Sequence, residues 1–597
     1  MSTRFISNNS QNNTDIVSKL YPSRLSSPWV RNPSWPIISA SIGSQRVVGL
    51  YAVYPNEDNF IALNCQGPYT VNYGDGTVTD YNGVQANYIF NYSSANLVGT
   101  DAPVTFTAST DLVNRTAHGY TNGMLVQFYN IVTTTGIVEA QYYYVINATA
   151  NTFQISSIAG GTAINLVGDG SATLLPYRIA TVTITPQSGQ FISLVNLCLK
   201  HNQAGLVNNY STGWLDIVIA SSDLSSLTIG SSNVNVRHLR LQQVRIIELG
   251  FITSFINLFA NCTALQSVEI SASTFAVNTT NGMFQNCYSL TTVPLFDTGT
   301  VQNMGSMFQG CFNLTTIPLL NTAAAISMAS MFQNCYSLRS VPLFNTTNTT
   351  SLGAMFNSCF GLTEVPLFNT VNVTDMGAMF QGCSSLTIVP LFNTDSVQNM
   401  TSMFANCWSL PAVPLFNTAS VQTMNSMFAN CVSLETVRLF NTINVVNMSN
   451  MFQGCVDLKS VPLFNTINVV NMSSMFLGCL NLATVPLFNT VTVFNFSSMF
   501  SGCSNLQSVP ALITTAVATS ANFTTMFASC PSLSRIQARN FRFTFSVANC
   551  KLSATALNEI YTNLPTVTSQ TITVTGNYGT ATDNPAIATA KGWTVTG

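Results

Sequence analysis

From residue 287 to residue 503 the hydrophobic positions repeat with a period of 24 residues. Ten cysteines mark the period: Cys287, Cys311, Cys335, Cys359, Cys383, Cys407, Cys431, Cys455, Cys479 and Cys503. Around most of them the same text recurs, with Met-Phe-x-x-Cys-x-x-Leu followed by Val-Pro-Leu-Phe-Asn-Thr, as in residues 379–394. Because a unit of this length buries its apolar face only against its neighbours, the period predicts a parallel solenoid with one coil per repeat.

Each coil has two limbs with different hydrophobic spacing. The first limb fits a short strand with the side chains of Leu386, Val389 and Leu391 directed inward. The strands of adjacent coils should lie about 4.8 Å apart. In the return limb, from Val397 to Cys407, the apolar residues lie three or four positions apart. That spacing predicts one or two turns of α-helix or 3₁₀-helix.

Two further rows follow this strand. Alternation sends the phenylalanine after the last inward leucine outward, and it recurs as Phe296, Phe344, Phe368, Phe392, Phe416, Phe440, Phe464 and Phe488. Three explanations fit so many outward rings: burial by a bend in the coil, burial by contact with another subunit, or an exposed face that binds a ligand. The next residue is expected to form an internal ladder that caps backbone groups of adjacent coils, as Asn321, Asn345, Asn369, Asn393, Asn417, Asn441, Asn465 and Asn489.

The residue directly after each cysteine varies, which a purely structural position need not do. Its aromatic members gather toward the N-terminal half of the array and are the candidate ligand-binding residues: Tyr288, Phe312, Tyr336, Phe360 and Trp408. Stacked exposed rings suit sugars or a protein partner. The structural alternative is a half-buried rim that tolerates any bulky side chain.

The repeat text resembles the BspA-type leucine-rich repeats of bacterial and phage surface proteins. The resemblance runs from about residue 255 to about residue 536, and it rests on the Met-Phe-x-x-Cys-x-x-Leu segment and the asparagine-threonine turn. It implies a leucine-rich-repeat solenoid that presents a binding surface.

Ahead of the repeats the pattern predicts strands at residues 47–53, 60–63 and 69–73, the last ending at Gly74-Asp75-Gly76. This strand and turn resemble those of PKD-type β-sandwich domains, whose final strand we expect at residues 177–185. The residues between read as a small β domain inserted at a loop tip. Its text from His118 to Ile155 resembles small β-sandwich modules of phage tail and other virion proteins.

The expected fold is therefore mainly β, with N-terminal β-sandwich domains followed by a leucine-rich-repeat-like parallel solenoid and its capping units. The C-terminal cap should contain a helix that starts at Ser553 and buries Leu557, Ile560 and Tyr561. The expected parts are an extended N-terminal arm (1–45), a PKD-like β-sandwich (46–99 with 176–188), the inserted β domain (100–175), an N-terminal solenoid cap (189–260), the repeat array (261–536) and a C-terminal cap (537–597).

The composition argues against several kinds of binding partner. Only 7% of residues are charged and the net charge is −2, which gives no electrostatic footprint for nucleic acid or acidic membranes. The cysteines lack the paired spacing of a metal site, so we expect buried reduced thiols and no metal or cofactor. The N-terminus lacks the apolar core of a signal peptide and no segment has the length of a membrane span, so folding in a cytoplasm and no membrane insertion are expected.

Two classes of function fit these features. The first is a non-enzymatic virion structural protein, assembled in the host cytoplasm as a phage fibre, decoration or receptor-binding component. It would be a homo-oligomer, attached to other virion proteins by its arm and β domains, with a solenoid that binds a host-surface glycan or protein. The second is a BspA-like adhesin at a bacterial cell surface.

A third possibility is a glycan-cleaving tailspike. Such an enzyme needs two carboxylates beside one glycosidic bond. Glu435 and Asp457 are the nearest to such a pair, but Lys459 is close enough to make a surface charge cluster the simpler explanation. Glu435 and Lys459 both lie four residues after a cysteine, so correct stacking should place them side by side.

Overall fold

The computed structural model describes residues 31–597 apart from 33–34, 40, 55–58, 99–101, 140, 159, 175–176, 204–209, 272–276, 294, 514–520 and 540. Residues 1–30 of the expected N-terminal arm therefore lie outside the described residues. The chain divides into two compact units, one of residues 1–324 with 335–337 and one of residues 325–334 with 338–597.

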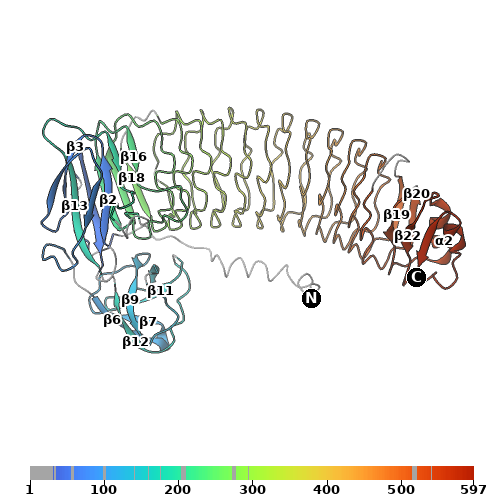
Figure 1. Ribbon diagram of the computed structural model, residues 1–597, viewed down its shortest axis with the longest axis horizontal. Coiled ribbons are helices and arrows are strands. Elements are labelled where there is room, and N and C mark those ends of the chain that lie inside the picture. Colours follow the sequence, from blue (N-terminus) through green and yellow to red (C-terminus); the bar gives the residue numbers. More distant parts are fainter. Residues whose placement is uncertain are drawn as a thin grey trace. The chain divides into compact units, whose positions relative to one another are not determined.

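The first unit is built around a seven-stranded sheet in which a β-sandwich passes directly into the first coils (Figure 1). Its first five strands pair antiparallel and its last two continue in parallel. In order these are β4 (Val78–Asn82), β3 (Pro68–Asn72), β13 (Arg178–Pro186), β1 (Arg46–Val53), β15 (Trp214–Ala220), β17 (Gln243–Glu248) and β18 (Ser267–Ile270).

The opposing sheet changes direction in the same way. Strand β2 pairs antiparallel with β5 and β14, and β14 then pairs in parallel with β16. The order is β16 (Ser226–Thr228), β14 (Leu194–Asn196), β2 (Phe60–Cys65) and β5 (Ala86–Ile89). The sandwich and the first coils therefore share backbone hydrogen bonds through both sheets.

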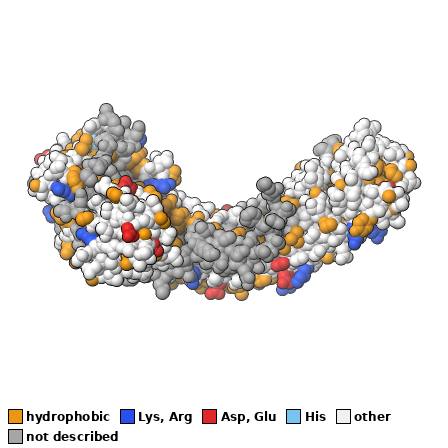
Figure 2. All heavy atoms as spheres, turned by 90° about the horizontal axis from the view of Figure 1, so that it is seen from below, with side chains coloured by type: hydrophobic (Ala, Val, Ile, Leu, Met, Phe, Trp, Pro, Cys, Tyr) orange, Lys and Arg blue, Asp and Glu red, His pale blue; other side chains and the backbone are white. Residues whose placement is uncertain are grey.

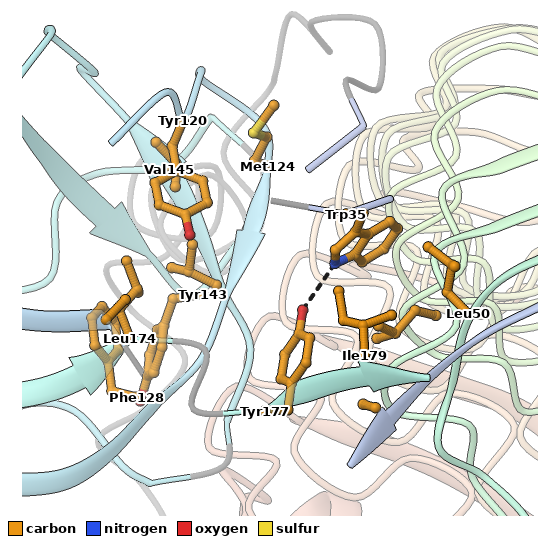
Figure 3. Close-up of a cluster of buried hydrophobic side chains, with 14 of the residues drawn as sticks. Trp35, Leu50, Tyr120, Met124, Phe128, Tyr143, Val145, Leu174, Tyr177 and Ile179 are labelled. Atoms are coloured by element: carbon orange, nitrogen blue, oxygen red, sulfur yellow. Dashed lines mark hydrogen bonds between the residues drawn. The ribbon is translucent and has the colours of Figure 1, made fainter. Parts of the chain in front are cut away.

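A third sheet of the first unit takes all its strands from residues 102–174. Its order is β8 (Leu125–Val126), β10 (Tyr143–Ile146), β11 (Thr152–Ser156), β7 (Leu112–Asn114), β6 (Ala102–Thr107), β12 (Gly170–Leu174) and β9 (Phe128–Val132), and a short 3₁₀-helix, η1 (Ala108–Thr110), lies between β6 and β7. We call this segment the insert. Its buried side chains, such as Phe128 and Tyr143, share one core with Leu50 and Ile179 of the sandwich (Figure 3).

Residues 35–45 carry no helix or strand among their described positions, yet they are packed. Trp35, Ile38 and Ile42 are buried in the same core. The Trp35 indole Nε1 donates a hydrogen bond to the Tyr177 hydroxyl at 3.0 Å (Figure 3). This part of the chain is therefore held against the sandwich by both apolar burial and a buried hydrogen bond.

In the second unit, equivalent residues of successive coils form parallel bridges. The chain of pairs is Ser327, Ser351, Asp375, Asn399, Thr423, Asn447, Asn471, Asn495 and Asn522. The predicted parallel stacking is confirmed. The coils follow one another as open loops in Figure 1, and strands with a ladder form only near the C-terminal end, as β19 (Ser508–Ile513) and β20 (Arg535–Arg539).

The return limb is a series of tight turns, so the prediction of helix there was wrong. Met379 N and Cys383 N donate to Met376 O and Phe380 O of their own coil, at 3.2 and 3.0 Å. Phe380 N instead donates to Met403 O of the next coil at 2.9 Å. A continuous helix would use every donor within the coil and leave none to join the coils.

The direction of the side chains after the conserved proline was also predicted wrongly. Leu391 is 59% exposed, whereas Phe392 is 2% exposed and stacks on Phe380 with ring centroids 6.3 Å apart. The cause is a tight turn at Leu391, closed by a hydrogen bond from Phe392 N to Pro390 O at 3.0 Å. This turn breaks the alternation of an extended strand and exchanges the inward and outward residues.

The asparagines are not the internal ladder that the sequence predicted. Asn393 is exposed, and its Oδ1 accepts a hydrogen bond from Asp395 N of the same coil at 2.9 Å. An asparagine side chain satisfies its own turn more readily than a neighbouring coil. The ladder is made by the next residue, since buried Thr394 donates from Oγ1 to Asn417 O of the next coil at 2.6 Å.

The cysteines form a second buried ladder. The Cys383 Sγ lies 3.1 Å from Phe356 O of the preceding coil, to which the thiol donates. All fifteen cysteines are free and buried, which confirms the prediction of buried reduced thiols. Burial raises the pKa of the Cys431 thiol to about 12.

The C-terminal cap closes the second unit with a parallel sheet of β21 (Phe545–Ser546), β22 (Gln570–Thr573) and β23 (Trp593–Thr596), together with α2 (Ala554–Asn563) and α3 (Ala586–Thr589). The predicted helix start is confirmed, because Ser553 Oγ accepts a hydrogen bond from Ala556 N at 3.2 Å. Leu557, Ile560 and Tyr561 are buried as expected.

The thiol ladder predicts that the protein loses stability in alkaline solution. Burial raises the folded-state pKa of Cys383, and of equivalents such as Cys407 and Cys455, above the usual value near 9.0. Above that pH the unfolded chain releases protons that the folded chain retains, so the free energy of unfolding should fall by about 1.4 kcal/mol per pH unit for each thiol. Urea unfolding between about pH 8 and pH 10, in a thiol-free reductant, measures this slope. Cys383→Ala should reduce the slope by the contribution of one thiol, about 1.4 kcal/mol per pH unit. A free energy of unfolding that stays level above pH 9 would contradict the prediction.

A pair of adjacent substitutions tests the corrected orientation. Phe392→Ala should lower the free energy of unfolding by about 3–5 kcal/mol, because it leaves a cavity in the core. Leu391→Ala should change it by less than about 0.5 kcal/mol, because the side chain is mostly in water. Thermal and urea unfolding of both variants give the comparison. A larger loss of stability for Leu391→Ala than for Phe392→Ala would instead support the strand alternation that the sequence predicted.

Candidate functional site

The aromatic residue after each cysteine is placed at the edge of its coil by a tight turn. Leu314 N donates to Cys311 O at 3.1 Å, and this turn directs both Cys311 and Leu314 into the core. Phe312, between them, is left half-buried. The same holds for the other four candidates, which are all half-buried.

In the first unit the structure brings three of the predicted site residues together. Tyr288 and Phe312 have ring centroids 4.5 Å apart with an interplanar angle of 7°. Phe312 and Tyr336 follow at 4.7 Å and 5°. We call Tyr288, Phe312 and Tyr336 the aromatic stack. Because Phe312 lies between the other two rings, both of its faces are occupied and it offers its ring edge to a partner.

The insert reaches the coil that carries the first of these rings. The Tyr144 hydroxyl donates to Ser289 Oγ at 2.9 Å in a buried contact. Tyr144 also packs with Leu125 of the insert and Ala264 of the preceding coil. The residue next to Tyr288 is therefore held by the insert, and the aromatic stack begins at a junction between two β modules.

Sequence reasoning missed this junction, although a signal was present. Tyr142, Tyr143 and Tyr144 follow one another, and successive residues of a strand point to opposite faces. Every residue of β10 (Tyr143–Ile146) is buried. Large apolar side chains on both faces of a strand indicate that both faces are covered, here by the core of the insert and by the first coils.

Phe360 and Trp408 belong to the second unit, where they occupy the same position of their coils. Ser384 stands between them in the chain of repeats and is buried. Val432, Val456 and Leu480 fill the position in later coils and are half-buried as well. The structure thus places the aromatic and aliphatic residues named at this position in a similar, half-buried setting.

Glu435 and Asp457, the nearest to a catalytic pair in the sequence, belong to a surface charge cluster. Lys459 Nζ and Glu435 Oε2 are 2.7 Å apart, which confirms their predicted side-by-side placement. Both side chains are more than half exposed, and the hydrogen bond from Lys459 to Glu435 raises the lysine pKa. Asp457 accepts a hydrogen bond from Asn481 Nδ2 at 3.3 Å. Figure 2, which draws one face of the molecule, shows few charged side chains among the uncharged ones.

Within the described part of the chain, no group of three or more His, Cys, Asp or Glu residues is arranged to hold a metal ion. The nearest approach is a pair, with His238 Nε2 3.4 Å from Cys198 Sγ, and burial lowers the pKa of His238 to about 4. Of the helices that the structure describes, none has both the length and the apolar character to cross a membrane.

The stacked parallel coils, with leucine and cysteine inside each turn, define a leucine-rich-repeat type of solenoid. Residues 253–364, 350–462 and 457–561 each match the family described as "Mycoplasma protein of unknown function, DUF285". Together these matches run from residue 253 to residue 561, which is more than half of the 597 residues. The chain therefore belongs to this family.

Similar solved structures include a leucine-rich repeat protein from Eubacterium ventriosum, with 15% identity over 50% of this chain and 87% of that chain and a TM-score of 0.30. A leucine-rich repeat protein of Leptospira interrogans has 10% identity over 61% and 85%, with a TM-score of 0.19. The complex of Toll and Spätzle from Drosophila has 15% identity over 60% and 53%, with a TM-score of 0.21, so this chain spans about half of that chain's length. None of the curated proteins compared with the chain matches it.

Proposed function

We propose that this chain is a non-enzymatic structural protein of a virion, in which the solenoid presents a binding surface and the N-terminal β modules attach it to the particle. The repeat solenoid fits a binding or adhesin role. The observation that carries the proposal is the junction at Tyr144 and Ser289, where the insert is fixed to the coil that carries the aromatic stack. A binding surface built at such a junction is held rigidly relative to the modules that anchor it.

The sequence resemblances of the first unit support the attachment role. The turn at Gly74-Asp75-Gly76 joins β3 to β4, as in the PKD-type sandwich that this segment resembles. The insert resembles β modules of phage tail proteins. Strand β1 pairs with β13 on one side and with β15 on the other, so the sandwich and the first coils form one hydrogen-bonded body. Force on an attached particle would pass through these ladders.

The geometry of the aromatic stack favours a protein partner over a glycan. A sugar ring binds best against the open face of an aromatic ring, and the faces of Phe312 are covered on both sides. Half-buried aromatic edges beside neutral polar groups are typical of protein interfaces. We propose that the partner is a protein on the host surface or a neighbouring virion protein.

A second function is a surface adhesin of a bacterium. It is favoured by the family match, which covers the repeat array and carries the description of a Mycoplasma protein. The two functions share the same binding surface and differ in what the N-terminal modules are attached to.

Substitutions in the variable aromatic position test the binding role. Tyr336→Ala and Trp408→Ala should each weaken attachment of the purified chain to host cells by at least about 10-fold, and they should lower stability by much less than a fully buried ring would. Val432→Ala, at the same position of a later coil, is the matched control and should leave attachment unchanged. Protease treatment of the cells should abolish binding, and periodate treatment should not. A loss of several kcal/mol of stability with unchanged attachment would make these rings part of the core.

The location of the chain separates the two functions. Mass spectrometry should find it at a fixed ratio to the other structural proteins in particles purified by density gradient. Its recovery only in the cell-envelope fraction would reject the virion role in favour of the adhesin.

A further inference from the structure

A row of exposed leucines is the most extensive surface feature that the aromatic positions do not explain. In the second unit the same side chain lies in water in seven successive coils, with exposed fractions between 56% and 59%. We call this set the leucine row: Leu343, Leu367, Leu391, Leu415, Leu439, Leu463 and Leu487. Leu295 and Leu319 of the first unit occupy the same position and are 68% and 62% exposed.

The leucine row has no role in the core of its own chain. The tight turn that exposes Leu391 recurs at Leu415 and Leu463, where the next phenylalanine donates to the proline carbonyl at 3.1 and 3.0 Å. In each case that phenylalanine fills the interior and the leucine is left outside. Single exposed leucines are ordinary, whereas a contiguous apolar row on a protein surface marks an interaction site.

The size of the row fits a stable protein interface. Each leucine, a little more than half exposed, presents on the order of 100 Å² of mainly apolar surface. Seven of them present roughly 700 Å², above the few hundred Å² of an ordinary monomer surface. About 800 Å² per partner is typical of stable complexes.

We propose that the leucine row is the contact between two copies of this chain, packed antiparallel about a two-fold axis at Leu415. The row repeats once per coil, and the phenylalanine rings next to it, such as Phe368 and Phe392, are 6.3 Å apart. A second copy presents the same side chain with the same period, so an axis at Leu415 places each leucine of one copy opposite a leucine of the other. A closed two-fold contact of this kind uses one surface patch twice.

The charges beside the row select the antiparallel arrangement. Two-fold symmetry about Leu415 places the coil that begins at Cys359 opposite the coil that begins at Cys455 of the second copy. Glu364 and Lys459 lie five and four residues after these cysteines, on the same side of the row, and both are exposed. They therefore face each other at the rim, where Lys459, which pairs with Glu435 of its own chain, meets a second carboxylate. In a parallel pair the same coils face each other, so Glu364 and Lys459 are four coils apart.

This inference is independent of the proposed virion role, because it concerns the purified chain alone. Sedimentation of the full chain at micromolar concentration should give about twice the 64.3 kDa of one copy. Replacing three central members of the row, by Leu391→Asn, Leu415→Asn and Leu439→Asn, should raise the dissociation constant by at least about 100-fold. The matched control is Ile443→Asn, Ile467→Asn and Val491→Asn, which removes partly exposed apolar side chains outside the row and should leave the dimer intact.

Cross-linking tests the register. Leu415→Cys should form a disulfide-linked dimer under mild oxidation, because it lies on the two-fold axis and the native thiols are buried. Leu343→Cys should not link to itself, but it should link to Leu487→Cys in a mixture of the two variants. Glu364→Lys should weaken the dimer, and adding Lys459→Glu should restore it.

Three results would overturn the proposal. The first is a wild-type chain that stays at the mass of one copy up to about 100 μM, since an interface of this size should associate at that concentration. The second is a folded triple asparagine variant, shown by an unchanged circular dichroism spectrum, that remains a dimer. The third is self-linking of Leu343→Cys as efficient as that of Leu415→Cys, which would reject the antiparallel register.

Discussion

The structure depends on how each coil divides its backbone hydrogen bonds. In the return limb alternate residues donate within their own coil and to the next one, as Met379 and Phe380 do. A buried N–H without a partner is costly, so each coil requires a neighbour placed in one register. This requirement accounts for the strict period, because an inserted residue would exchange the two sets of donors. It also accounts for the left-handed conformation at Ala378, with φ 54°. At this point the donors change direction, because Ala378 N donates to the next coil and Met379 N donates within its own coil.

The same stacking explains the unusual chemistry of the sequence. A residue that recurs in every coil lies next to its own copies at about 4.8 Å, so a charged residue would meet like charges on both sides. Neutral groups can instead form ladders, as the thiol of Cys383 and the hydroxyl of Thr394 do with carbonyls of adjacent coils. Two examples show how a charge is accommodated: Asp375 accepts a hydrogen bond from the neutral Asn399 of the next coil, and Glu435 lies beside Lys459, which has the opposite sign. Repetition therefore accounts for the low content of charged residues within the repeat array.

Features set by the period could be predicted from the sequence, and features set by local turns could not. The period placed the parallel coils and the buried thiols with their apolar flanks, and an N-cap residue with apolar spacing after it placed the helix that starts at Ser553. It failed for Leu391 and Phe392, because a three-residue turn reverses side-chain direction without changing the period. It failed for Asn393, because the side chain caps its own turn. For the candidate site, the repeats predicted that Tyr288 and Phe312 are neighbours, but the contact of Tyr144 with Ser289 joins residues 145 positions apart and left no periodic signal.

The parallel pairing of β15 with β17 and of β17 with β18 has a consequence for how the array folds. A lone coil is unstable, because it has neither a partner for its donors nor a cover for its apolar face. A sandwich that folds first would offer the first coil an ordered edge strand, and that coil would then add to an existing template instead of nucleating on its own. Growth of the solenoid from this end would order only one coil at a time. The conformational entropy lost in forming the first ordered edge would be offset by the packing of the sandwich.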